Sequence, residues 1–333
     1  MHRLMNYLYY KSDKKYAEGL LDRRSCLMIL LAEAKLSNRT AVVPKFALGS
    51  QHNHGKRIES YLIGTYLEIG KLGVDYILEE DFRQIEKQIP EDEILNIEDK
   101  PFDFKTKKQL VIRNLKDDNF WSLKKTFDVF SLAKQYHGVG VKFVVPLVTA
   151  PEKVKAIGNK ILDQLQEPVV GLHLRRGDRL NKKLKNGMAE KAILNKLSQF
   201  EYKSVFYCTN DRDYHINHPN YFSSKDFSEE LAGIEDNYLL FAIEMYIVDH
   251  CDISVRTFND SSPFYFIEST QEKNYAICDY SMHGSNNRFR TIPNQLVKCN
   301  YESKDSDKRK AFVKPRPLIP TVIKVIRRKL NMA

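Results

Sequence analysis

The sequence predicts an α/β fold whose strands form parallel sheets. Three observations predict it. The second half of the chain alternates strand-like and helix-like segments, its strand segments are short apolar runs, and 42% of all residues are hydrophobic. At 333 residues the chain can form two domains of ordinary size. We expect an N-terminal α/β domain over 1–150, a C-terminal Rossmann-like domain over 151–300, and a basic linker with a terminal helix over 301–333.

The first half contains few regular patterns. Residues 20–36 are rich in Leu, Met and Ala and predict a helix, which Asn38 and Arg39 separate from a predicted strand over 40–44. Less regular segments follow to about residue 150. A strand over 143–146 and a helix over 151–166 are expected near the domain junction.

The second half predicts a parallel sheet. We expect strands over 168–174, 204–208, 252–256 and 275–278, and helices over 189–200, 238–250 and 263–270. In such sheets ligands bind beyond the carboxyl ends of the strands. Three polar segments fall at such ends, namely 175–178, 209–213 and 257–262. Their convergence predicts a binding site at this edge of the sheet.

Two adjacent arginines, Arg175 and Arg176, follow the predicted strand that ends at residue 174. A guanidinium group is planar and matches the geometry of phosphate, so the pair is suited to an anionic ligand. Asp178 can orient one guanidinium, and Gly177 allows a sharp turn. A structural salt bridge at the strand end is the alternative, and the arginines alone do not decide between the two.

The segment from Asn259 to Pro263 leads into a predicted helix. Asp, Ser and Pro are ordinary residues for a helix start, and that is one interpretation. In the other, the hydroxyl groups of Ser261 and Ser262 and the free backbone N–H groups of the helix start hold a phosphate.

His173-Leu174-Arg175-Arg176-Gly177-Asp178 resembles the HxRRxD motif of the fucosyltransferase superfamily. The members of that superfamily have the GT-B fold of two Rossmann-like domains and use GDP-fucose. The segments 206–211 and 251–268 resemble two further strand-end motifs in the same order and at similar spacing. Near the N-terminus, 19–24 and 38–44 resemble the family's opening turn and its "NRTLVxP" strand.

The resemblance implies roles for individual residues. Arg175 would bind the β-phosphate of a GDP-sugar, with Arg176 and Asp178 shaping the site and Asp178 the candidate general base. The other donor-binding candidates are His173, Thr209, Asp211, Glu244, Ser261 and Ser262. Glu244 would bind guanine, because a carboxylate can accept hydrogen bonds from N1–H and from the exocyclic amine. A half-exposed structural Glu244 and a satisfied buried His173 are the alternatives.

The resemblance implies an inverting transfer of fucose, or of a related sugar, to an oligosaccharide or lipid-linked acceptor in bacterial surface polysaccharide synthesis. No metal or other cofactor is expected. A metal-dependent GT-A transferase is an alternative, because Asp211 and Asp213 form an Asp-x-Asp pattern, as do Asp305 and Asp307. A non-catalytic relative that binds sugar nucleotides or glycans is another.

The net charge of +10 belongs mainly to the C-terminal segment. Residues 301–333 contain ten Lys/Arg and three Asp/Glu, which leaves about +3 for the rest of the chain. This distribution argues against a nucleic-acid-binding face on the folded body. The amphipathic, basic segment 317–333 predicts contact with an anionic membrane surface, and packing on the protein body is the alternative.

The compartment is expected to be the cytoplasm, at the inner face of the cell membrane. The first twenty residues lack the apolar core of a signal peptide, because Lys11, Asp13, Lys14 and Lys15 interrupt it. The five cysteines are widely spaced and odd in number, which favours free thiols in a reducing compartment.

Overall fold

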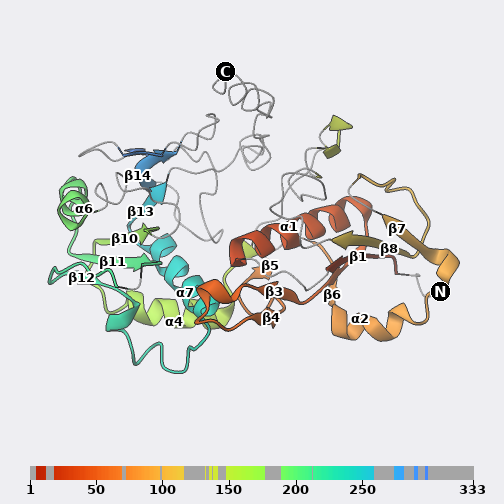
Figure 1. The fold of residues 1–333 in the computed structure, drawn as a ribbon, viewed down its shortest axis with the longest axis horizontal. Helices are drawn as coiled ribbons and strands as arrows, with labels where there is room; N and C mark the ends of the chain where they lie inside the picture. Colours follow the sequence, from red (N-terminus) through yellow and green to blue (C-terminus); the bar gives the residue numbers. More distant parts are fainter. Residues whose placement is uncertain are drawn as a thin grey trace, which may run out of the picture.

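The protein contains two parallel sheets that lie side by side along its longest axis (Figure 1). The computed structural model describes residues 5–12, 19–69, 73–97, 100–115, 132, 135–136, 138–141, 148–176, 189–211, 213–258, 274–280, 289–291 and 297–298. The first sheet takes its strands from residues 7–115 and the second from residues 169–298. The predicted α/β class with parallel sheets is therefore confirmed.

The first sheet has five parallel strands in the order β6-β2-β1-β8-β7. Its strands are β1 (Tyr7–Ser12), β2 (Thr40–Val43), β6 (Tyr76–Leu78), β7 (Ile94–Ile97) and β8 (Leu110–Leu115). Helix α1 (Leu20–Ser37) packs with Leu8 and Tyr10 on one face of the sheet. Phe82 of helix α2 (Glu79–Glu86) packs with Tyr7 and Tyr9 on the other. The sheet is thus covered on both faces.

The central strand β1 has no counterpart among the elements expected from the sequence. The structure also adds β3 (Phe46–Leu48), β4 (Ile58–Ser60), β5 (Glu68–Ile69), β6, β7, β8 and α2 to the part of the chain between 45 and 142. The predicted helix over 20–36 and the predicted strand over 40–44 are confirmed as α1 and β2.

A buried ion pair joins α1 to the first sheet. Glu33 of α1 and Arg113 of β8 are both fully buried, and the Arg113 guanidinium donates from Nη2 (2.5 Å) and Nε (3.1 Å) to the Glu33 carboxylate. The hydroxyl groups of Tyr10 and Tyr136 also donate to this carboxylate. A buried charge is tolerated only when it is paired and hydrogen-bonded. The contacts among these four side chains therefore allow Glu33 and Arg113 to be buried in the core.

The Asn38-Arg39 pair has a structural role. Asn38 adopts the left-handed conformation (φ 51°) that ends α1, and its backbone N–H donates to carbonyl groups of the last turn. The buried Arg39 guanidinium donates to the carbonyl oxygens of Tyr7 (3.3 Å), Gln109 (3.4 Å) and Thr106 (3.0 Å). Arg39 therefore closes the amino ends of the central strands, opposite the edge where ligands are expected.

The second sheet has the order β12-β11-β10-β13-β14-β15, and β16 also pairs with β14. Strands β10 to β14 are parallel, whereas β15 and β16 run antiparallel to β14. The strands are β10 (Val169–Leu174), β11 (Ser204–Thr209), β12 (Tyr221–Phe222), β13 (Ile253–Phe258), β14 (Asn274–Tyr280), β15 (Phe289–Thr291) and β16 (Val297–Lys298). The four predicted strands of the second half are therefore confirmed.

Helices cover this sheet on both faces. Helix α7 (Asn237–His250) lies on one face and packs against α4 (Glu152–Leu162), while α6 (Glu190–Leu197) lies on the other. Each was predicted, although α4 ends four residues before the predicted limit of 166. The predicted strand over 143–146 and helix over 263–270 lie outside the described residues.

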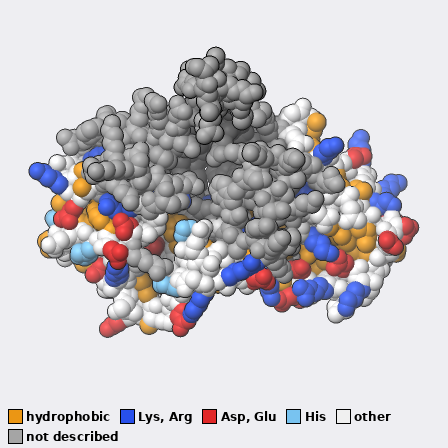
Figure 2. Space-filling model, in the orientation of Figure 1, with side chains coloured by type: hydrophobic (Ala, Val, Ile, Leu, Met, Phe, Trp, Pro, Cys, Tyr) orange, Lys and Arg blue, Asp and Glu red, His pale blue; other side chains and the backbone are white. Residues whose placement is uncertain are grey.

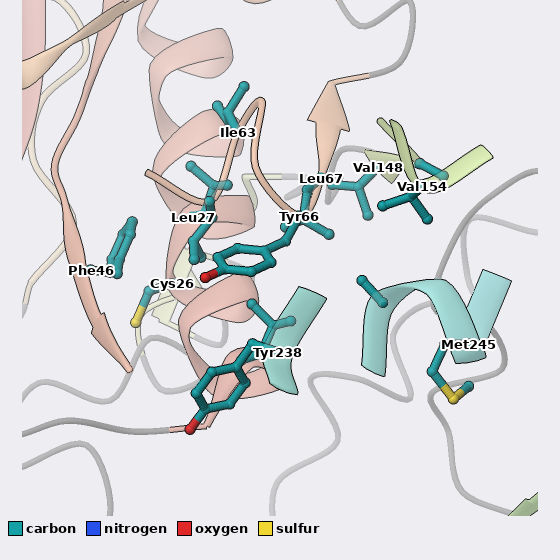
Figure 3. Packing of buried hydrophobic residues seen from close by; sticks show 14 of the residues in the cluster. Cys26, Leu27, Phe46, Ile63, Tyr66, Leu67, Val148, Val154, Tyr238 and Met245 are labelled. Atoms are coloured by element: carbon teal, nitrogen blue, oxygen red, sulfur yellow. The ribbon is translucent and has the colours of Figure 1, made fainter. Parts of the chain in front are cut away.

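One apolar core extends through both halves of the molecule. Figure 3 shows Leu27 of α1 and Tyr66 beside Tyr238 of α7, and Val148 beside Leu67; these residues and Met245 of α7 belong to one buried cluster. A short antiparallel pair, β5 with β9 (Val148–Thr149), joins the halves beside this core. The two large sheets therefore share one buried cluster, and each has a smaller cluster of its own on its other face.

Hydrogen bonds tie the start of α7 to the first half of the chain. The Tyr66 hydroxyl donates to Asp236 (2.6 Å), and the Tyr238 hydroxyl donates to the carbonyl of Gly49 (2.6 Å). The Asn237 backbone N–H donates to the side chain of Asn53 (2.9 Å). Helix α7 thus begins on the first half and continues under the second sheet.

Within the described residues, no helix is long and apolar enough to cross a membrane. In the view of Figure 2, basic and acidic side chains are interspersed over the described surface. Among the described residues, Cys26, Cys208 and Cys251 are buried and form no disulfide.

Candidate functional site

The carboxyl ends of β11, β10 and β13 lie next to one another at one edge of the second sheet. β10 is the middle strand, and His173 pairs in register with Cys208 of β11 and with Arg256 of β13. All three strands are parallel, so the polar segments that follow them meet at this edge. The predicted convergence is therefore observed for the described residues 175–176, 209–211 and 257.

Side chains of both neighbouring strands hold the end of β10. The backbone N–H of Arg175 donates to the hydroxyl of Thr257 (2.5 Å), which in turn donates to the carbonyl of His173 (2.9 Å). The backbone N–H of Arg176 donates to the side-chain carbonyl of Asn210 (2.8 Å). The first two residues beyond the strand are thus fixed from opposite sides.

The two arginines belong to opposite faces of the sheet. Leu172 and Leu174 pack into the cluster under α6, and Gly171 faces α7, where an added Cβ would lie 2.7 Å from the Val248 backbone. Because side chains alternate along a strand, Arg175 continues the α7 face and Arg176 continues the α6 face.

Contacts on the α6 face confirm the placement of Arg176. Its Nε donates to the Asp211 carboxylate (3.2 Å), and its guanidinium carbon lies 3.7 Å from the centre of the Tyr214 ring. Tyr214 itself packs against the apolar cluster under α6. Asp211, half of the Asp-x-Asp pattern considered above, is therefore an ion-pair partner of Arg176 in this structure.

On the α7 face, His173 lies close to Arg175 and to Phe241 of α7. Its ring centre is 6.2 Å from that of Phe241. Burial, and then the positive charges of Arg256 and Arg175, lower the pKa of His173 to about 3. The imidazole is therefore neutral at physiological pH and can exchange hydrogen bonds, but it adds no positive charge to the site.

Glu244 of α7 shares this face. Phe241, Glu244 and Val248 are spaced by three and four residues, which places them on one stripe of the helix. Burial raises the pKa of Glu244 to about 7, and a hydrogen bond from the Ser224 side chain acts in the opposite direction. The side chain retains partial exposure. The pKa of this carboxyl group therefore lies in the physiological range, as the pKa values of functional carboxyl groups often do.

A buried ion pair lies beneath these side chains. Arg256 of β13 donates to the carboxylate of Asp249, which is fully buried. Arg256 also contributes to the low pKa of His173. Arg256 was not among the predicted site residues, although a charged residue within a buried strand run, seven residues after an acidic residue of the preceding helix, was a usable signal.

The sequence analysis missed other positioning side chains as well. Thr257 and Asn210 hold the end of β10, Tyr214 stacks on Arg176, and Ser224 contacts Glu244. Each acts on a residue that lies far from it in the sequence. Thr209, predicted to bind the donor, accepts a hydrogen bond from the backbone N–H of Asp211 (3.2 Å) and so shapes the turn after β11.

The structure brings together five of the predicted site residues around one sheet edge, with Glu244 reaching it from α7. The five are His173, Arg175, Arg176, Thr209 and Asp211. The predictions for Asp178, Ser261 and Ser262 lie outside the described residues, as do those for Lys/Arg of the terminal segment 301–333.

No protein-family model matches the chain, and no curated protein matches its sequence. Solved structures do resemble it. POFUT1 in complex with GDP-fucose is 13% identical and aligns over 76% of this chain and 90% of that chain, with a TM-score of 0.43. The fucosyltransferase NodZ from Bradyrhizobium is 12% identical over 87% and 99%, with a TM-score of 0.46. NodZ α-1,6-fucosyltransferase soaked with GDP-fucose is 14% identical over 87% and 100%, with a TM-score of 0.45.

Proposed function

We propose that this chain is a glycosyltransferase that takes fucose, or a related sugar, from a GDP-sugar bound at the carboxyl edge of the second sheet. The observation that carries the proposal is the arrangement on the α7 face. Arg175 lies just beyond the end of β10, and the neutral His173 lies two residues earlier, within the strand. The carboxyl group of Glu244 lies on the adjacent helix α7. Arg175 suits the phosphate end of a nucleoside diphosphate, and Glu244 suits its base.

Each end of the donor has a matching group. The Arg175 guanidinium can donate two hydrogen bonds to the β-phosphate oxygens. An ionised Glu244 can accept from both N1–H and the exocyclic amine of guanine, whereas uracil offers only one donor on its pairing edge. The site therefore favours a guanine nucleotide over a uracil nucleotide.

The reaction would be an inverting displacement at the anomeric carbon. The oxygen of an acceptor hydroxyl forms the new bond to that carbon while the bond to the β-phosphate oxygen breaks, and the hydroxyl proton passes to a base. GDP leaves with the bonding electrons, so negative charge develops on the phosphate. Arg175 would stabilise that charge without a metal ion, and Asp178 is the candidate base.

The acceptor is proposed to be an oligosaccharide or a lipid-linked glycan of bacterial surface polysaccharide synthesis. The basic, amphipathic pattern of 317–333 supports a location at an anionic membrane surface in the cytoplasm. Sedimentation of the full chain with anionic vesicles, but not of a chain lacking 317–333, is expected. Equal sedimentation of both would contradict the membrane contact.

The central test combines binding and transfer. GDP is expected to bind at least tenfold more tightly than UDP, and Arg175→Ala is expected to reduce GDP affinity and transfer from GDP-fucose by about a hundredfold or more, in the range found when a transition-state donor is removed. Calorimetry and GDP-release assays give these values, and the thermal transition of Arg175→Ala checks its fold. Retained transfer in folded Arg175→Ala, or a preference for UDP, would overturn the proposal.

A further inference from the structure

On the α6 face, three side chains surround Arg176 at the end of β10, and we call them the bracket. The proposed contacts of Arg175 and Glu244 with the donor do not require them. We define the bracket as Asn210, Asp211 and Tyr214, all from the segment that follows β11. Asn210 accepts from the backbone N–H of Arg176 at 2.8 Å, and Asp211 accepts from its Nε at 3.2 Å. The central carbon of the Arg176 guanidinium lies 3.7 Å from the centre of the Tyr214 ring.

Two hydrogen bonds from backbone N–H groups fix the conformation of the bracket. The Asp211 backbone N–H donates to the Thr209 hydroxyl (3.2 Å), and the Tyr214 backbone N–H donates to the carbonyl of Asp211 (3.1 Å). These two bonds form a compact turn at the end of β11. Tyr214 packs against the apolar cluster under α6, so its ring has a fixed position relative to the sheet.

The environment of Tyr214 is consistent with a role for its ring and not for its hydroxyl. Burial raises the pKa of Tyr214 to about 12, and Arg176 acts in the opposite direction. The hydroxyl oxygen is buried and has no hydrogen-bond partner within the described part of the chain. A cation over an aromatic face interacts with the ring quadrupole, which phenylalanine supplies as well as tyrosine does.

We infer that Tyr214 is a positioning residue of the donor site, acting through Arg176 to fix the direction in which Arg175 leaves the end of β10. This inference rests on the proposed function. Arg175 and Arg176 are consecutive, so a fixed Arg176 backbone and side chain fix the peptide group between them. On the other side, Thr257 holds the N–H of Arg175. The Arg175 side chain then starts from a defined backbone and has fewer conformations to lose when a diphosphate binds.

The same geometry gives the two arginines different roles. Arg176 faces α6 and shares its charge with Asp211, whereas Arg175 faces α7 with His173 and Glu244. Arg175 is therefore the residue expected to contact the donor, and Arg176 with Tyr214 supports it from the opposite face of the sheet.

The test compares GDP with guanosine, which lacks the phosphates. Tyr214→Leu keeps apolar bulk but removes the aromatic face, and it is expected to weaken GDP binding about tenfold while guanosine binding stays within twofold of the wild type. Tyr214→Phe keeps the face and is expected to bind GDP as the wild type does. A general loss of packing would weaken both ligands alike, so the ratio of the two affinities separates positioning from stability.

Two further variants sharpen the test. Tyr202→Leu is the matched control, because Tyr202 packs on the same α6 face against Tyr221 and is not part of the bracket. It is expected to leave GDP affinity unchanged. Arg176→Lys keeps the charge but loses the planar stack, and it is expected to weaken GDP binding as Tyr214→Leu does. If the two residues act as one unit, the double variant is no weaker than either single variant.

Wild-type GDP affinity in folded Tyr214→Leu, an equal loss for guanosine, or additive effects in the double variant would each overturn the inference alone. If Tyr214→Leu does not fold, Arg176→Lys carries the same comparison of GDP with guanosine. A wild-type chain that binds no GDP would overturn the proposed function together with the inference, so the two failures are distinguishable.

Discussion

At the scale of single residues, the α7 face of the second sheet combines groups whose ionisation depends on burial. Glu244 has a pKa raised to about 7, mainly by burial, and His173 has a pKa lowered to about 3 by burial and two arginines. Arg256 and Asp249 form an ion pair nearby, and burial also raises the pKa of the Cys208 thiol, with a further contribution from Glu244. Glu244 is therefore the group on this face that changes charge near neutral pH.

The ionisation of Glu244 predicts opposite pH dependences of folding and binding. Its pKa in the folded state lies above the usual value of 4.5, so its contribution to stability is fully present below pH 4.5 and is lost as the pH rises through about 7. Guanine binding needs the carboxylate. Between pH 6 and pH 8 the ionised fraction rises about tenfold, and GDP affinity is expected to rise by a similar factor.

Glu244→Gln is the control for both effects. The amide keeps a hydrogen-bonding group near Ser224 but does not titrate, and it is expected to weaken GDP binding at pH 8 while the thermal transition at that pH stays the same or rises. The phosphate groups of GDP titrate too, so the informative quantity is the ratio of wild-type to variant affinity at each pH. A ratio that does not change between pH 6 and pH 8 would rule out Glu244 as the base-binding carboxylate.

At the scale of elements, the position of the site depends on the close approach of β10 and α7. A Cβ atom at Gly171 would lie 2.7 Å from both the Cα and the carbonyl oxygen of Val248 and 3.0 Å from the Cys251 sulfur. Backbone atoms of a packed helix cannot move aside as a flexible side chain can. Gly171→Ala is therefore expected to cost about 2 kcal/mol or more in the free energy of unfolding, in the range of overpacked cores.

The matched control is Gly138→Ala, because an added Cβ there meets no atom within 4 Å. Its free energy of unfolding is expected to change by no more than about 0.5 kcal/mol, as for other exposed substitutions. Urea denaturation of the two variants measures the difference. Equal stabilities for Gly171→Ala and the wild type would show that α7 can move away from β10, and the rigid geometry of the site would have to be abandoned.

The elements also show why the sequence predicted the second half better than the first. β10 is a buried run that is apolar apart from His173, and α7 is a mostly apolar segment too long for a strand. β1 contains three tyrosines and is bordered by charged residues, so its pattern is not apolar. It is buried because the hydroxyl groups of Tyr9 and Tyr10 donate hydrogen bonds to the carboxylates of Glu79 and Glu33, which are distant in sequence.

The same distinction applies to the site. The pattern of strand ends predicted where His173, Arg175, Arg176 and Asp211 would converge, because topology follows from the order of elements. It could not predict which face each arginine would take, since that depends on which helix covers each face. It also could not predict the tyrosine under Arg176, which depends on the path of the turn after β11.

At the scale of the whole molecule, two sheets share one continuous core. Leu67 belongs to the first half and is fully buried, together with Val148, Tyr238 and Met245, and α7 starts on hydrogen bonds to the first half. Independent domains are usually joined by linkers that few contacts cross. Here α7 both closes the interface and lies under the site, so the fold of the first half supports the geometry of the second.

This continuity predicts that the two halves unfold together. Leu67→Ala, a truncation in the first half, is expected to lower global stability by about 2 to 5 kcal/mol. Because the core is shared, amide hydrogen exchange is expected to lose protection by the same free energy in β1 and in β10, although β10 belongs to the other sheet. Exchange followed by mass spectrometry measures both strands in one sample. If Leu67→Ala exposed β1 while β10 kept its wild-type protection, the halves would be independent folding units, and positioning of the α7 face by the first half would be excluded.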